Sequence, residues 1–194
     1  LAAKKEFDTY IEMLIPLLKK QDHSIDVNCA KECVYRIYRD VRFSKNKEPY
    51  KNSFGAYISK GGRKSPYAGY YIHFEPDNSF VGGGIYQPSP TILKSIRNQI
   101  FEHTDAYKKI LTKKELKNEF SVLEGAKLKM APKGFPKDFK DIDLLKNKHF
   151  TVRKKIDNKL WLKKNSVELI LKSFETQQDF NHFLNRVVEA EIVS

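Results

Sequence analysis

The chain has 194 residues, of which 40% are hydrophobic and 12% aromatic; this composition is typical of a globular protein and excludes an intrinsically disordered one. Its formal net charge is +12, so it attracts nucleic acid or anionic surfaces non-specifically. No apolar run approaches the roughly 20 residues that a membrane-spanning helix needs, which excludes an integral membrane protein of that kind.

Helices are predicted where apolar residues recur at three- and four-residue spacing. They cover residues 2–20, residues 91–101, short stretches within 108–123, residues 141–147 and residues 167–188. Pro16 lies inside the first pattern and predicts a kink or an early stop. Because Leu1 stands within the helical pattern, we expect this helix to continue ahead of it.

Strands are predicted where β-branched and aromatic residues cluster between turn residues. They cover residues 32–38, 54–60, 69–75, 79–86 and 150–152. A polar loop over 44–51, the turn Gly61-Gly62 and the turn 76–78 separate the first four. The strands cluster in the first half and the helices at the two ends. This order predicts a single α+β domain over 1–194, with a mainly antiparallel sheet packed by the N-terminal and C-terminal helices.

The positive charge is concentrated in two segments. Residues 113–164 carry sixteen basic and seven acidic residues, nearly all the basic ones lysine, which is typical of a solvated surface. Residues 36–64 carry nine basic and two acidic residues, and three of the seven arginines of the chain lie between Arg36 and Arg42. Guanidinium groups bind carboxylate and phosphate through two parallel hydrogen bonds, so this segment is the main candidate for a functional site.

The same segment carries a family resemblance. The pattern RxxRDxRFxxNKxxY over residues 36–50, followed by GAYISKGGRKSPYAGYY over 55–71, resembles the family catalogued as domain of unknown function 2461. The resemblance extends to nearly everything after the first helix. It implies a bacterial protein with additional helix ahead of Leu1, and it implies no activity.

Strand alternation divides the candidate residues between two faces. In residues 34–38, Arg36 and Tyr38 share one face and Tyr35 and Ile37 the other. Applied to the neighbouring strands, the same rule gives one apolar face. The other face is then expected to carry Arg36, Tyr38, Tyr57, Tyr71, His73 and Glu75.

The glycine runs and His73 each allow both a structural and a functional interpretation. The run Gly82-Gly83-Gly84 lacks the Lys-Ser/Thr of a phosphate loop, and a bulge or close backbone packing is favoured. The loop 61–65 is either a hairpin turn or an anion site with exposed N–H groups. His73 and Glu75 are either a hydrogen-bonded pair or acid–base groups.

The remaining signals predict neither a metal nor a cofactor. The five histidines show no ligand spacing, and Cys29 and Cys33 form no CxxC pair. With two cysteines and no disulfide framework, we expect packed thiols and a cytoplasmic location.

The leading hypothesis is a domain that binds a small phosphorylated or carboxylated ligand. The candidate ligand-binding residues are Arg36, Tyr38, Arg39, Asp40, Arg42, Lys47, Tyr50, Arg63, Lys64 and Tyr71. Three alternatives stay open: binding of single-stranded nucleic acid, a hydrolase or transferase that uses His73 and Glu75, and docking of an acidic partner. A structural ion-pair network also remains an alternative for the arginines, and the oligomeric state is open.

Overall fold

A computed structural model describes residues 2–39, 42, 47–122 and 127–193. The chain forms two compact units, each with its own hydrophobic core. The first unit comprises residues 1–65, 69–81 and 155–175, and the second comprises residues 66–68, 82–154 and 176–194. The single domain over 1–194 stays a prediction.

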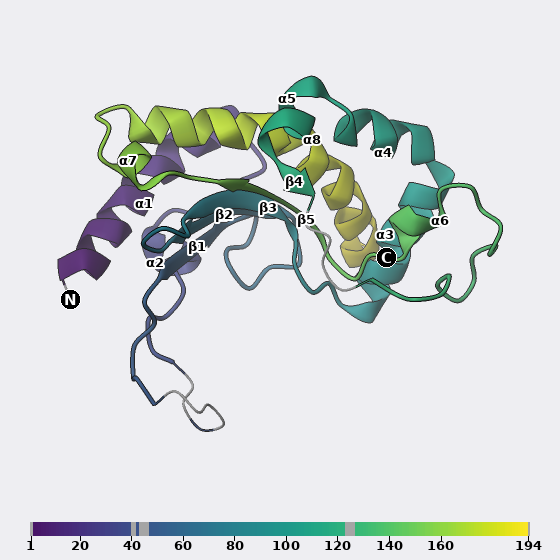
Figure 1. Ribbon diagram of the computed structural model, residues 1–194, viewed down its shortest axis with the longest axis horizontal. Helices are drawn as coiled ribbons and strands as arrows, with labels where there is room; N and C mark the ends of the chain where they lie inside the picture. The colour runs from purple at the N-terminus through teal and green to yellow at the C-terminus, as the bar shows by residue number, and fades with distance from the viewer. Residues whose placement is uncertain (1, 40–41, 43–46, 123–126, 194) are drawn as a thin grey trace. The chain divides into compact units, whose positions relative to one another are not determined.

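The fold class is α+β with an antiparallel sheet, as the sequence predicts (Figure 1). The helices are α1 (Ala2–Gln21), α2 (Ala30–Cys33), α3 (Pro90–Glu102), α4 (Thr104–Leu111), α5 (Lys114–Glu119), α6 (Ile142–Leu145), α7 (Asn158–Trp161) and α8 (Ser166–Val193). The strands are β1 (Phe54–Ile58), β2 (Gly69–Phe74), β3 (Phe80–Ile85), β4 (Ser121–Val122) and β5 (Phe150–Lys155). Within the described residues, no helix combines the length and hydropathy that a bilayer span requires.

The first helix is amphipathic and ends one residue beyond the predicted range of 2–20. Its apolar face buries a row of side chains that includes Ile11, Leu14 and Leu18. Pro16 lies inside α1 on its exposed side, and the helix continues to Gln21. The early stop was therefore a wrong prediction, because the buried side chains on either side of Pro16 hold the last turn against the core.

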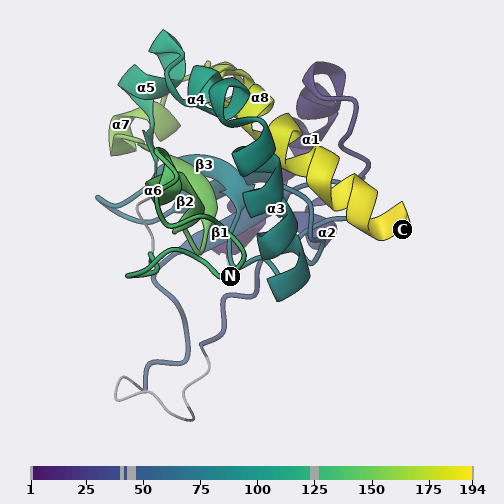
Figure 2. The ribbon, with the colours of Figure 1, turned by 90° about the vertical axis from the view of Figure 1, so that its right-hand side faces the viewer.

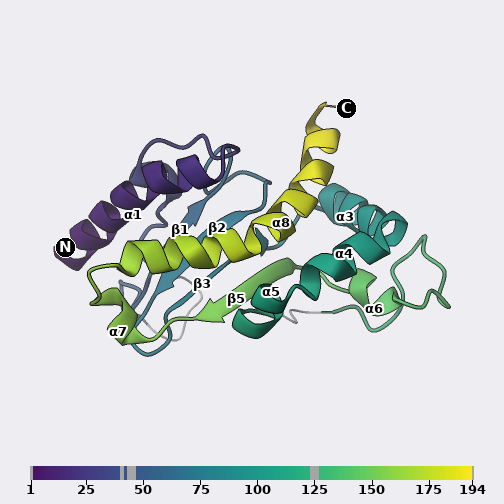
Figure 3. The same ribbon diagram turned by 90° about the horizontal axis from the view of Figure 1, so that it is seen from above.

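The core of the first unit lies between helices and the apolar face of β1 and β2. Strand β1 pairs antiparallel with β2, and β2 lies between β1 and β3. The buried side chains include residues of α1, of both strands and of residues 166–175 of α8, together with others from α2 and the neighbouring loops. Figure 3 shows α1 and this part of α8 over the two strands. The Phe174 ring contacts Tyr70 with 4.9 Å between centroids, which joins α8 to β2.

The second unit contains α3 to α6 and residues 176–193 of α8. Its core contains Ile96 of α3, Tyr107 of α4 and Phe183 of α8, together with Phe150 and Val152 of β5. Helix α3 lies beside the end of α8, where the hydroxyl of Ser95 donates a hydrogen bond to Glu191 (Figure 2). Strand β5 lies between β3 and β4 and pairs antiparallel with β4.

The glycine run in β3 permits close contact between backbones. A Cβ atom at Gly82 would lie 2.3 Å from the carbonyl oxygen of Val152, and one at Gly84 would lie 2.1 Å from that of Phe150. Gly84 also has a φ of +97°, which L-residues rarely adopt. These contacts confirm the interpretation of the run as close backbone packing.

Candidate functional site

Strands β1 and β2 present one apolar and one polar face, as their alternation predicts. Tyr57 lies opposite Tyr71, and Gly55 lies opposite His73. Phe54, Ala56, Ile58, Tyr70, Ile72 and Phe74 belong to the core or pack against it. The absence of a side chain at Gly55 leaves room for Tyr71, whose hydroxyl would lie 2.8 Å from a Cβ there.

The predicted strand over 32–38 is not a regular strand. Residues 30–33 form the short helix α2, whose first N–H donates to Oε1 of Glu12 at 2.7 Å. Only Val34 then bridges to β1, at Ala56, and Tyr38 bridges to Tyr50. The residue types favour a strand, but the contact with α1 and a bend at residue 37 limit the pairing with β1 to one residue.

This geometry differs from the predicted facing at Tyr35. The ring of Tyr35 contacts that of Tyr71 with 6.4 Å between centroids, so Tyr35 lies against the polar face of the strands. Arg36 was expected there instead. Arg36, like Tyr35, lines a hollow beside α1.

The hollow is the main candidate site, and all of it belongs to the first unit. Its volume is about 360 Å³. The lining residues come from α1, from α2 and the residues after it, and from the loop after β1. They are Lys4, Asp8, Glu12, Ala30, Lys31, Val34, Tyr35, Arg36 and Arg63. Sequence reasoning had proposed Arg36 and Arg63 and missed the others.

The two acids of the hollow already have partners. Asp8 forms an ion pair with Lys4 one helical turn earlier, and Glu12 accepts the N–H of Ala30. Within the described part of the chain, by contrast, Lys31 and Arg36 each lack a carboxylate partner. Four cations and two carboxylates line the hollow, so it keeps an excess of two positive charges.

Arg63 is placed by its contacts with α2. Its guanidinium donates to the carbonyl oxygen of Lys31, and its backbone N–H donates to that of Glu32 at 3.0 Å. Burial raises the pKa of the Tyr35 hydroxyl, and the positive charge of Arg63 works against that rise. Arg63 and Tyr35 therefore influence each other electrostatically within the hollow.

The loop 61–65 is a turn whose N–H groups are largely used within the protein. Gly61 donates to Oδ1 of Asp26 at 2.7 Å, Gly62 to Ser59 at 2.9 Å, and Ser65 to Gly62 at 3.0 Å. Gly61 and Gly62 have φ values of +76° and +77°. The geometry favours the hairpin turn over an anion site formed by backbone groups. Lys64 is exposed and does not line the hollow.

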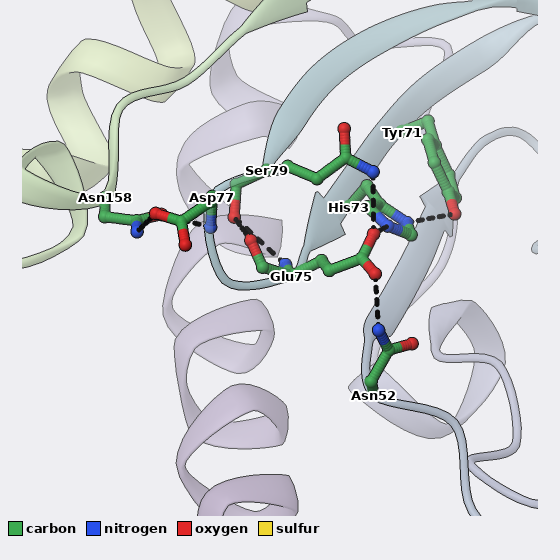
Figure 4. A network of polar contacts seen from close by, with 8 residues as sticks. Asn52, Tyr71, His73, Glu75, Asp77, Ser79 and Asn158 are labelled. Carbon is green, nitrogen blue, oxygen red and sulfur yellow. Dashed lines mark hydrogen bonds and ion pairs between the residues drawn. The ribbon is translucent and has the colours of Figure 1, made fainter.

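The polar face of β2 carries a hydrogen-bonded network around His73 (Figure 4). The Nε2 atom of His73 lies 3.0 Å from Oε2 of Glu75, and Nδ1 lies 3.2 Å from the hydroxyl of Tyr71. Asn52 and Asn78 donate to the same carboxylate at 2.6 Å and 2.8 Å. The neutral tautomer with a proton on Nε2 satisfies both contacts, because Tyr71 can donate to Nδ1.

The contacts of His73 favour a structural role over a role in proton transfer. Both ring nitrogens of His73 have partners, its ring stacks on Phe80 at 4.7 Å between centroids, and the hollow does not reach it. A general base needs a nitrogen within reach of a substrate proton. The geometry therefore favours the hydrogen-bonded pair over acid–base groups at His73 and Glu75.

Replacing Glu75 with glutamine is expected to make thermal stability less sensitive to acid. The hydrogen bonds from His73, Asn78 and Asn52 hold the pKa of the Glu75 carboxyl below its usual range. The ionised carboxylate therefore contributes stability above its unfolded pKa of about 4.3, and that stability is lost as pH falls through the lower folded pKa. The melting temperature should fall less between about pH 6 and about pH 3 in Glu75→Gln than in the wild type.

Glu175→Gln is the matched control, since Glu175 is exposed on α8. This variant should show the full wild-type decrease in melting temperature. An equal decrease in Glu75→Gln would mean that the network does not contribute to acid stability.

The other predicted ligand residues either form a second cluster, are exposed, or lie outside the residues that the structure describes. Tyr38 and Tyr50 contact each other, and Arg39 lies 3.4 Å from Glu48 in an ion pair. Arg42 and Lys47 are exposed, and Asp40 lies outside the described residues. The structure thus brings Arg36 and Arg63 together, and it separates them from the contacts made by Tyr38, Arg39 and Tyr50. No three His, Cys, Asp or Glu residues in the described part gather as a metal site would require.

Comparison with known proteins gives a family without an assigned activity. The model of the family described as "Conserved hypothetical protein (DUF2461)" matches residues 1–183. No curated protein and no solved structure shows significant similarity to the chain.

Proposed function

We propose that this chain, which belongs to the conserved hypothetical protein family DUF2461, binds a small phosphorylated or carboxylated ligand in the charged hollow. One observation carries the proposal. Lys31, Arg36 and Arg63 line the same hollow, while the two acids that line it are engaged by Lys4 and the N–H of Ala30.

Electrostatics favour an anion in this position. Cations that line one small cavity repel each other, and two of them about 8 Å apart do so by about 2 kcal/mol at an effective dielectric constant of about 20. An anion bound between them adds an attractive interaction with each cation, and these attractions offset the repulsion. Guanidinium groups are also suited to carboxylate and phosphate, because their N–H donors match the spacing of two oxygens.

The size and walls of the hollow suit a small ligand. A volume of about 360 Å³ lies at the lower end of the range for ligand pockets, about 300–1,000 Å³. One wall is the face of α1 that carries Lys4, Asp8 and Glu12, and the other carries Arg36 and Arg63.

The test is thermal stability in the presence of phosphate, nucleotides and sugar phosphates, each at constant ionic strength adjusted with sodium chloride. At a concentration 100 times its dissociation constant, a ligand adds about 2.7 kcal/mol to the free energy of unfolding. For a chain of this size, the melting temperature should rise by about 5 to 10 °C. Arg36→Ala should abolish most of this rise without lowering the stability of the unliganded protein, because Arg36 is exposed.

Arg186→Ala provides the control, since it removes an arginine from an exposed position on α8 outside the hollow. It should keep the full rise in melting temperature. The proposal is wrong if none of these anions stabilises the protein, or if Arg36→Ala and Arg186→Ala respond equally.

A reducing compartment, and hence the cytoplasm, is part of the same proposal. Both cysteines are free thiols, and burial raises the pKa of Cys33 to about 12. A buried thiol of this kind is protonated and unreactive at neutral pH, as expected of a packing residue in a reducing environment.

A further inference from the structure

Two tyrosines outside the hollow form an exposed aromatic pair. Tyr38 is 57% exposed and Tyr50 is 53% exposed, and their ring centroids lie 5.4 Å apart at an angle of 39°. Figure 1 shows residues 35–39 and 47–51 running away from β1. We call Tyr38, Tyr50, Arg39 and Lys51 the tyrosine platform.

The backbone holds the two rings together. The N–H of Arg39 donates to the carbonyl oxygen of Pro49 at 2.9 Å, and the N–H of Lys51 donates to that of Ile37 at 2.8 Å. Tyr38 and Tyr50 form an antiparallel bridge between these two bonds. The rings are therefore neighbours by backbone pairing, and both are more than half exposed among the described residues.

The charge around the platform is strongly positive. Residues 36–39, 42 and 47–51 include five cations and one carboxylate, an excess of four positive charges. The carboxylate is Glu48, which is 75% exposed in its side chain and pairs with Arg39 at 3.4 Å. An exposed ion pair of this length contributes little to the stability of the fold, so another anion can replace the Glu48 carboxylate at Arg39.

We propose that the tyrosine platform binds single-stranded nucleic acid without sequence preference, independently of the small anion in the hollow. Exposed aromatic rings stack on unpaired bases, and flanking cations contact the phosphates. A protein partner would instead need a desolvated apolar centre around the rings, whereas Arg39, Glu48 and Lys51 surround them with charge.

The experiment measures fluorescence anisotropy of a labelled oligothymidine with the full chain. The wild type should bind the single strand more tightly than a duplex of the same length, because the bases of a duplex are already stacked. If four phosphates are contacted, affinity should fall about fifty-fold between about 50 mM and about 200 mM salt. Tyr38→Ala and Tyr50→Ala should each weaken binding by about ten-fold.

Three controls separate stacking from other causes. Tyr86→Ala should leave affinity unchanged, since Tyr86 is 67% exposed and stacks on His149 outside the platform. The double variant Tyr38→Phe/Tyr50→Phe should keep most of the affinity, because phenylalanine retains the ring face. The melting temperatures of all variants should match the wild type.

Four results would overturn the proposal. They are absence of oligothymidine binding at low salt, equal affinity for the duplex, alanine variants that bind like the wild type, and displacement by polyglutamate as effective as that by unlabelled oligothymidine. The last result would indicate an acidic protein partner in place of nucleic acid.

Discussion

Gly84→Ala is expected to lower the free energy of unfolding by about 4 kcal/mol. The new Cβ would lie 2.1 Å from the carbonyl oxygen of Phe150 and 2.8 Å from the ring of Phe180. Neither the β5 backbone nor a fully buried ring can move away without disturbing the core of the second unit. The φ of +97° adds about 1 to 2 kcal/mol for any residue with a Cβ. Guanidinium unfolding followed by far-ultraviolet circular dichroism measures the loss.

Gly134→Ala separates the two causes. Gly134 has a similar φ of +93°, but a Cβ there would have no neighbour within 4 Å. This variant should lose only the backbone contribution, about 1 to 2 kcal/mol. If Gly84→Ala lowers the free energy of unfolding no more than Gly134→Ala does, then β3 and β5 can move apart, and their close packing contributes nothing to stability.

Local periodicity explains what the sequence predicted well. The facing of β1 and β2 follows from a side-chain period of two: Ile72 and Phe74 alternate with His73, and this alternation assigns Tyr70 to the apolar face. The apolar spacing of α1 and α8 depends in the same way on residues three and four apart. These signals are contained within the elements themselves, so no knowledge of their neighbours is required.

The predictions failed where a distant contact decides the local structure. The strand predicted over 32–38 was based on Val34 to Tyr38, but its first residues belong to α2, where Glu12 accepts the first N–H of residues 30–33 and fixes a helical turn. The chain that follows α2 then places Tyr35 against Tyr71 on the polar face, where Arg36 was expected. Periodicity predicts that side chains alternate along a strand, but it cannot predict at which residues the pairing with the neighbouring strand begins and ends.

The candidate site was only partly visible for the same reason. The density of arginine in a lysine-rich chain drew attention to Arg36, and Arg63 followed from its position beside two glycines. Lys31 and Lys4 had no distinguishing signal among 29 lysines. The spacing of Lys4, Asp8 and Glu12 places them on one face of α1, and this was the one local clue to the wall of the hollow.

Asp22→Ala is expected to lower the free energy of unfolding by about 3 kcal/mol. Asp22 follows α1 and is 3% exposed. Its Oδ2 accepts the hydroxyl of Tyr70 at 2.5 Å, and its Oδ1 accepts the N–H and the hydroxyl of Ser24 at 3.0 Å and 2.7 Å. These bonds join the end of α1 to β2 and to the following loop, so they help to hold the helix that forms one wall of the hollow.

A double-mutant cycle with Tyr70→Phe tests whether the bond between Tyr70 and Asp22 causes the loss of stability in Asp22→Ala. Tyr70→Phe alone should lose about 2 kcal/mol, because it removes a donor from a buried carboxylate. The double variant should lose less than the sum of the two, by about 1 kcal/mol or more, since neither change can remove the shared bond twice. Denaturant midpoints measured at equal m-values give the free energy of unfolding of the wild type, the two single variants and the double variant. Strictly additive losses would show that Asp22 acts through Ser24 and the end of α1 alone, and that β2 is held to α1 by apolar packing.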